Sequence, residues 1–144
     1  MKGETGGKGD TGDTGPRGPS NAFVAADGPP AVVGTTFATQ RSLALGAGSY
    51  VVTATATLNN GDIGAVTAGC QLLLGGTAVD SALSLTLAPD TQGGETEAVS
   101  LTGAGSLTSA GTAQLQCRSS LTTTSLFAPS IVATQVASLT TPAP

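Results

Sequence analysis

The sequence predicts an all-β protein in which a short triple-helical segment, residues 1–20, precedes an antiparallel β-sandwich, residues 21–144. Two observations predict this. Glycine recurs at every third position near the N-terminus, which is the period of collagen. The rest of the chain consists of short runs in which apolar and polar residues alternate, separated by Gly, Asn, Asp and Pro, which is typical of strands and turns. No run has the apolar periodicity of a helix.

The glycine repeat predicts that three copies of the chain associate. Its six Gly-X-Y triplets begin at Gly3, Gly6, Gly9, Gly12, Gly15 and Gly18. At the axis of three polyproline-II strands only a hydrogen atom fits as a side chain, so a triple helix needs glycine in every triplet. The alternative, a flexible Gly-rich linker, has no reason to keep a strict period of three.

The triple-helical segment is too short to hold three chains together by itself. Eighteen residues at about 3.1 Å each form a rod of roughly 55 Å, and only two of its residues are proline. Its three cations balance its three anions, so residues 21–144 carry the whole net charge of −4. We therefore expect the domain that follows to supply the trimerisation.

Several runs place apolar side chains on one face of a strand. Residues 49–58 put Tyr50, Val52, Ala54, Ala56 and Leu58 on one face, and Asn59-Asn60-Gly61-Asp62 predicts a turn after them. Four further inward rows are Val66, Ala68, Cys70, Leu72 and Leu74, ended by Gly75-Gly76; Leu83, Leu85 and Leu87; Glu97, Val99 and Leu101; and Ala113, Leu115 and Cys117. With shorter strands around Phe23, Phe37 and Leu43–Leu45 and a last strand at 130–139, eight to ten strands are predicted, as in a sandwich.

The two cysteines each belong to an inward row, with 46 residues between them. We interpret them as a disulfide between neighbouring or facing strands, because a small domain with 3% aromatic residues needs a further source of stability. A disulfide that closes a loop of this length adds on the order of 4 kcal/mol to the free energy of unfolding. The alternative is a pair of buried free thiols in a reducing compartment.

The C-terminal segment predicts an oligomer interface. Residues 119–144 contain no charged side chain, and the strand predicted at 130–139 is apolar on both faces through Ile131, Val132 and Val136. In a monomer such a strand leaves apolar surface exposed. Only Asn21 and Ala22 connect the repeat to the domain, so we expect the rod and the domain to share a threefold axis as a homotrimer.

The composition argues against several functions. The chain has no histidine, which removes the commonest proton carrier and metal ligand, and almost no aromatic side chains for a sugar-binding cleft, so no enzymatic activity is expected. An acidic chain without a basic patch disfavours nucleic acid, and no apolar run is long enough to span a bilayer. No cofactor is expected; Asp90, Glu95 and Glu97 are a weak candidate for a Ca²⁺ site, with solvated loop charge as the alternative.

A Gly-X-Y stalk followed by about 120 residues of short strands resembles bacterial collagen-like proteins that carry a C-terminal trimeric jelly-roll head of the C1q/tumour-necrosis-factor type. Gly48-Ser49-Tyr50-Val51-Val52 is similar to the Gly-x-Tyr-x-aromatic strand of that superfamily, with Val52 in place of the aromatic residue. The Cys-Gln-Leu and Leu-Gln-Cys segments at 70–72 and 115–117 are similar to heads of actinobacterial collagen-like proteins. The fold alternative, an immunoglobulin sandwich, lacks the buried Trp expected between the cysteines.

The resemblance implies a structural protein outside the cell or on its surface. The head would form a homotrimer that aligns a collagen-like stalk on a bacterial surface or filament. The alternative is recognition: an adhesin, or a phage tail-fibre tip on a virion, that binds a glycan or a host-surface protein with threefold avidity.

Overall fold

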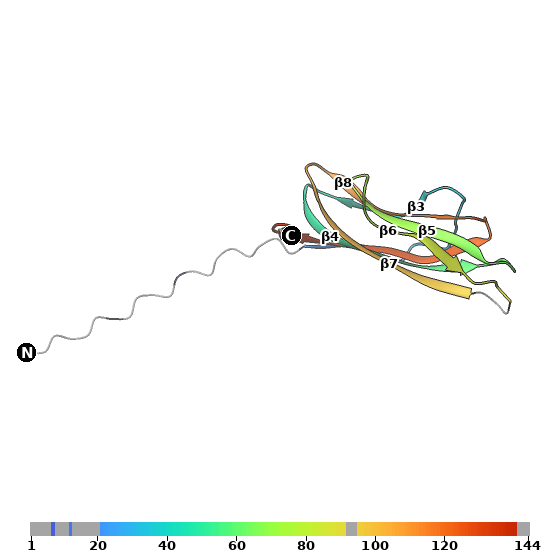
Figure 1. Ribbon diagram of the computed structural model, residues 1–144. Coiled ribbons are helices and arrows are strands. Elements are labelled where there is room, and N and C mark those ends of the chain that lie inside the picture. The colour runs from blue at the N-terminus through green and yellow to red at the C-terminus, as the bar shows by residue number, and fades with distance from the viewer. Residues whose placement is uncertain (1–6, 8–11, 13–20, 92–94, 141–144) are drawn as a thin grey trace, which may run out of the picture.

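The computed structural model describes residues 7, 12, 21–91 and 95–140, and these residues form nine strands in two layers (Figure 1). The strands are β1 (Ala22–Ala25), β2 (Ala31–Val32), β3 (Ala38–Leu45), β4 (Gly48–Asn60), β5 (Val66–Leu74), β6 (Thr77–Leu87), β7 (Glu95–Leu107), β8 (Gly111–Ser119) and β9 (Thr124–Val136). Of the six repeat glycines only Gly12 lies among the described residues, so the predicted triple helix falls outside them.

The two sheets are antiparallel and follow a jelly-roll order. One sheet, here the β4 sheet, has the order β1-β9-β4-β7, with β2 also paired to β9; the other, the β5 sheet, has the order β3-β8-β5-β6. The pairs nest within one another: β5 with β6, β4 with β7, β3 with β8 and β1 with β9. This is the order of one long hairpin wound into two sheets. The predicted sandwich is confirmed, and the immunoglobulin order, ABED against CFG, is not the one observed.

The inward rows form one core between the sheets, because alternate side chains of each strand point to the same face. The rows predicted on β4, β5 and β8 are buried throughout. The core is almost entirely aliphatic. Its largest side chain, Tyr50, donates a hydrogen bond to the carbonyl of Gly46 at 3.1 Å and meets the ring of Phe23 edge-on at 6.0 Å. Tyr50 thereby ties the core to the turn between β3 and β4.

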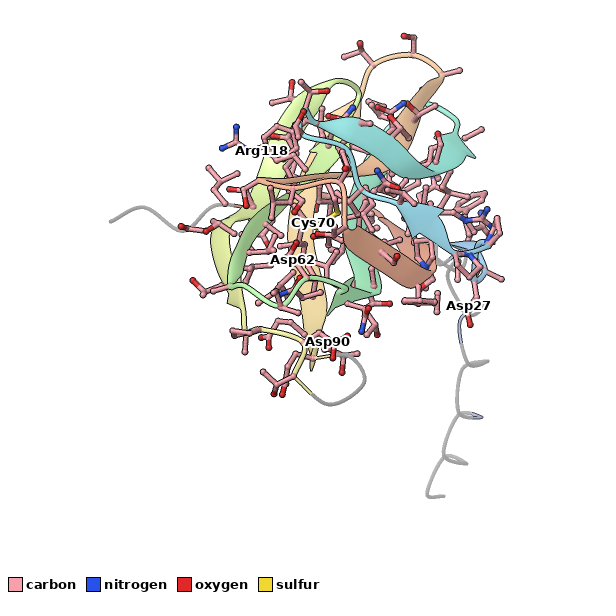
Figure 2. All side chains as sticks on the ribbon, turned by 90° about the vertical axis from the view of Figure 1, so that its right-hand side faces the viewer. Asp27, Asp62, Cys70, Asp90 and Arg118 are labelled. Atoms are coloured by element: carbon pink, nitrogen blue, oxygen red, sulfur yellow. A yellow bond between two sulfur atoms is a disulfide. The ribbon has the colours of Figure 1, made fainter. Side chains whose placement is uncertain are left out.

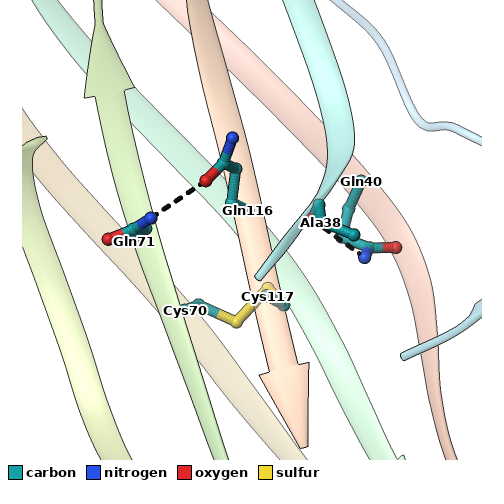
Figure 3. The surroundings of a disulfide bond; sticks show 6 residues. All are labelled: Ala38, Gln40, Cys70, Gln71, Gln116 and Cys117. Carbon is teal, nitrogen blue, oxygen red and sulfur yellow. Dashed lines mark hydrogen bonds between the residues drawn. A yellow bond between two sulfur atoms is a disulfide. The ribbon is translucent and has the colours of Figure 1, made fainter. Parts of the chain in front are cut away.

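Cys70 and Cys117 form a disulfide within the β5 sheet (Figure 3). They are directly opposite each other in the register of β5 and β8, with their Cα atoms 4.1 Å apart, and both side chains are fully buried. The disulfide prediction is confirmed, and it joins neighbouring strands. Figure 2 shows Cys70 in the interior of the molecule.

The row predicted through Leu83, Leu85 and Leu87 is only partly correct. Leu87 is buried, but Leu83 is 52% exposed. The pairing of β5 with β6 shifts between Ala68 and Cys70, so that two residues of β6 lie opposite Gly69 alone. A bulge of this kind turns the side chains that follow it to the other face.

The predicted turn at 59–62 begins later in the structure. Asn59 and Asn60 are the last residues of β4, and the chain bends after them. Asn60 is fully buried; its amide nitrogen donates to the carbonyls of Gly64 at 2.8 Å and Ala88 at 2.7 Å, and its side-chain oxygen accepts from the backbone N–H of Asp62 at 2.9 Å. Asn60 therefore connects the β4–β5 turn to the end of β6.

The register defines two ends of the sandwich. Ser49 pairs with both Ser106 and Val136, and Asn21 accepts a backbone hydrogen bond from Gln135, so the chain joins the domain at this end. At the opposite end, here the far end, Asn60 pairs with both Glu95 and Thr124. The start of β5 also lies at the far end, because β5 begins at Val66, just after the turn that follows Asn60. The end of β8 lies beside it, since Ala68 pairs with Ser119.

Candidate functional site: an uncharged sheet face

The outer face of the β4 sheet is the most distinctive surface of the molecule. Strand pairing sets its side chains in rows across β1, β9, β4 and β7, such as Val24–Val132–Thr53–Thr102 and Ala22–Thr134–Val51–Ala104. Further rows are Ser130–Thr55–Ser100, Phe127–Thr57–Ala98 and Val32–Ser125–Asn59–Thr96. We call these five rows the valine face. None of their residues, all of which the structure describes, is charged.

Most of the large apolar side chains exposed in the described structure gather on the valine face. They are Val24 (59% exposed), Val32 (65%), Val51 (37%), Phe127 (40%) and Val132 (41%). The outer face of an antiparallel sheet that meets water normally carries polar and charged residues. Contiguous apolar surface without charge is instead a mark of an interaction site.

The hydroxyl groups of the valine face bond to one another. Thr53 and Thr102 share a hydrogen bond of 3.0 Å across β4 and β7, and Thr55 and Ser130 share one of 2.8 Å across β4 and β9. Each such pair uses hydrogen-bonding capacity within the sheet. The face therefore loses less hydration when it is covered than its threonine and serine content suggests.

The three predicted interface residues separate between the two faces of β9. Val132 points outward on the valine face, and Val136, opposite Ser49, lies on the same side of the strand. Ile131 is fully buried in the core between the sheets, so it does not lie on the valine face. Residues 130–139 show apolar side chains on both faces because one face fills the core of the chain itself. Moreover, β9 is not an unguarded strand, since it pairs with β1 and β4.

The acidic candidates do not assemble into a metal site. Glu95 and Glu97 lie two residues apart on β7, whereas the backbone N–H of Asp90 donates to the carbonyl of Asp62 at 2.8 Å. Within the described residues no three acidic, histidine or cysteine side chains are grouped closely enough to hold a metal ion. The calcium candidate therefore has no support from the described geometry.

A groove opens on the outer face of the β5 sheet at the far end. It has a volume of about 240 Å³ and is lined by Thr35, Thr67, Ala68, Gly69, Leu83, Arg118, Ser119 and Ser120. Leu83 forms an apolar wall because the bulge turns it outward. Arg118 is directly opposite Gly69 in the register and projects from the periphery of the molecule in Figure 2. We call this the Arg118 groove; its position follows from a strand irregularity that sequence alternation did not reveal.

The described residues contain no helix with the length and hydropathy of a membrane span. No family model matches the chain, and no curated protein matches its sequence. The fold is similar to a crystal structure of the infectious bursal disease virus VP2 subviral particle, with a TM-score of 0.49 and 14% sequence identity. The likeness covers 82% of this chain and 33% of the viral chain, so this chain spans about a third of the length of that one. A likeness of this extent indicates no shared function.

Proposed function

We propose that the sandwich is a structural head that forms a homotrimer through the valine face and aligns three Gly-X-Y segments into a collagen-like triple helix. The observation that carries the proposal is an uncharged sheet face with five exposed large apolar side chains, beside the point where the repeat joins the domain. Ala22 begins β1, and Val24 of the same strand is part of the face. The occupant that we assign to the face is therefore a second copy of this chain.

A homotrimer would satisfy the requirements of both the glycine repeat and the valine face. A strict glycine repeat is stable only in a bundle of three chains, yet six triplets are too few to form that bundle alone. In a single chain, the valine face leaves five large apolar side chains exposed to water, which is unfavourable. A head trimer covers the face and raises the local concentration of the three repeats, which removes most of the entropic cost of bringing the chains together.

The same proposal places the protein outside the cell or on its surface, on a bacterial filament; the alternative location is a phage virion. The buried disulfide supports an oxidising location, because disulfides form and persist there and are rare in the cytosol.

The test introduces a charge on the valine face. In Val132→Lys the ammonium group would be buried at the interface without a partner, so we expect the full chain to dissociate into monomers at micromolar concentration. Light scattering coupled to size-exclusion chromatography measures this against the 13.8 kDa mass of one chain. The matched control is Ala44→Lys, the same charge at an exposed position on the outer face of the β5 sheet.

The unchanged chain and the Ala44→Lys control are expected to elute with three times the single-chain mass. A monomeric unchanged chain, or a Val132→Lys variant that remains trimeric, would contradict the proposal. Thermal unfolding of both variants checks that the fold persists, since both positions point away from the core.

A further inference from the structure

We propose that the Arg118 groove binds the carboxylated sugar residue of an acidic glycan. This site lies on the sheet opposite the valine face and is separate from the trimerisation function, so it remains on the outside of each chain when the valine face is covered. The proposal rests on the charge, the shape and the chemistry of the groove.

Arg118 is held in place by an aromatic ring. Its guanidinium carbon lies 4.8 Å from the centre of the Phe37 ring, a cation–π contact that restricts the side chain. Among the described residues no carboxylate pairs with it. An arginine guanidinium presents donors that match the two oxygens of a carboxylate. Of the described residues that line the groove, Arg118 alone is charged.

The other walls suit a sugar ring. Thr35, Thr67 and Ser120 carry hydroxyl groups that exchange hydrogen bonds with sugar hydroxyls, and Leu83 offers an apolar surface to the C–H groups of the ring. Sites for drug-sized molecules usually measure about 300–1,000 Å³. A volume of about 240 Å³ is therefore suited to one sugar residue rather than to a longer segment of a ligand.

Two other anionic ligands fit the groove poorly. Gly69 lies on β5, which has β6 on one side and β8 on the other, so an incoming peptide finds no free strand edge on which to add its backbone. The head carries the whole net charge of −4, so polyanions such as nucleic acids are repelled at long range. A single carboxylate, by contrast, would be attracted to the nearby guanidinium group of Arg118 once it is inside the groove.

The experiment titrates the isotope-labelled full chain with sialyllactose and follows the backbone amide signals of Gly69, Arg118 and Ser120 by NMR. Lactose, which lacks the acidic residue, is the neutral control, and acetate is the control for a carboxylate without a sugar. We expect sialyllactose to shift these signals in a saturable way, with no shift from lactose and none from acetate at the same concentration.

Two variants test the residues that carry the argument. Arg118→Gln is expected to weaken sialyllactose binding by at least about tenfold, because a hydrogen-bonded charge is lost. Leu83→Glu is expected to abolish binding, since it places a carboxylate in the groove. The matched control is Ile63→Glu, the same change at an exposed apolar residue outside the groove, which we expect to bind normally.

Equal binding of lactose, equal binding of acetate, or undiminished binding by Arg118→Gln would each overturn the proposal. Binding to one groove does not require assembly. A Val132→Lys chain that still binds sialyllactose would therefore support the sugar site, and the state of the trimer would be judged separately from its mass.

Discussion

Two buried polar or polarisable features hold the head together at the scale of single residues: the Cys70–Cys117 disulfide and the Asn60 side chain. Each supplies a kind of stabilisation that aliphatic packing does not provide, a covalent cross-link or hydrogen bonds to buried backbone groups. The disulfide cross-links two central strands in a domain with few aromatic residues, and Asn60 satisfies backbone groups at a turn. Both are expected to contribute stability without touching the valine face or the Arg118 groove.

Replacing both cysteines by alanine is expected to lower the free energy of unfolding by about 4 kcal/mol in oxidising buffer, because the unfolded chain regains the entropy of a loop of this length. Urea unfolding of the double variant and the unchanged chain, each with and without reductant, measures this. The difference should largely vanish under reducing conditions. A deficit of equal size in both buffers would instead indicate lost packing at two buried sites.

Asn60→Ala removes three hydrogen bonds to buried or partly buried backbone groups. Leaving such groups without partners costs about 1–3 kcal/mol, so we expect a loss of that size in urea unfolding. Asn59→Ala is the matched control, since Asn59 is the neighbouring residue on the outward side of the same strand. A similar loss in both variants would show that Asn60 has no special role.

At the scale of the elements, the two sheets approach closely along the side where β6 and β7 meet. Gly103 of β7 points inward against Val79 of β6; a Cβ atom at Gly103 would lie 2.6 Å from Val79 Cγ2 and 2.8 Å from the Val79 carbonyl oxygen. A side chain would thus meet backbone as well as a methyl group. The absence of a side chain at Gly103 lets these edge strands close that side of the sandwich.

Gly103→Ala is therefore expected to destabilise the head by about 1–3 kcal/mol through overpacking. Gly34→Ala is the control, because a Cβ atom there meets nothing within 4 Å. The thermal midpoints of the two variants, measured at the same concentration, provide the comparison. Equal midpoints would mean that the β6–β7 side relaxes freely around a methyl group.

At the scale of the whole molecule, the trimer proposal couples two segments of different chemistry. In the proposal, the repeat needs three chains but is too short to assemble them alone, and the valine face of the head brings them together. Loss of either component therefore has a distinct signature. A damaged repeat leaves a trimeric head, whereas a damaged valine face leaves neither trimer nor triple helix.

Gly9→Ala tests this coupling in the full chain. The added methyl group cannot fit at the axis of a triple helix and divides the run of six triplets, so we expect the polyproline-type circular dichroism melt to disappear. The head should remain folded and trimeric. Thr11→Ala, at a Y position of the same segment, is the control and should retain the melt; an unchanged melt in Gly9→Ala would contradict the triple-helix assignment.

Much of the fold could be predicted because strand alternation is a local property. Tyr50, Val52 and Leu58 had to share a face once β4 formed, and the same rule placed both cysteines inward. The rule failed at Leu83, where a bulge broke the alternation. The predicted turn differed at Asn60, which ends β4 and whose side chain bonds to the distant residue Ala88.

The sequence by itself determined the sandwich and the disulfide, because strand alternation and cysteine placement act along the chain. The proposal of three chains rests on the sequence too, through the glycine repeat. Only the tertiary structure decided that Ile131 fills the core while Val132 faces outward, and that Arg118, Gly69 and Leu83 line one groove. These outcomes depend on which strands pair and in what register. Pairing joins residues far apart in sequence, so no local pattern specifies it.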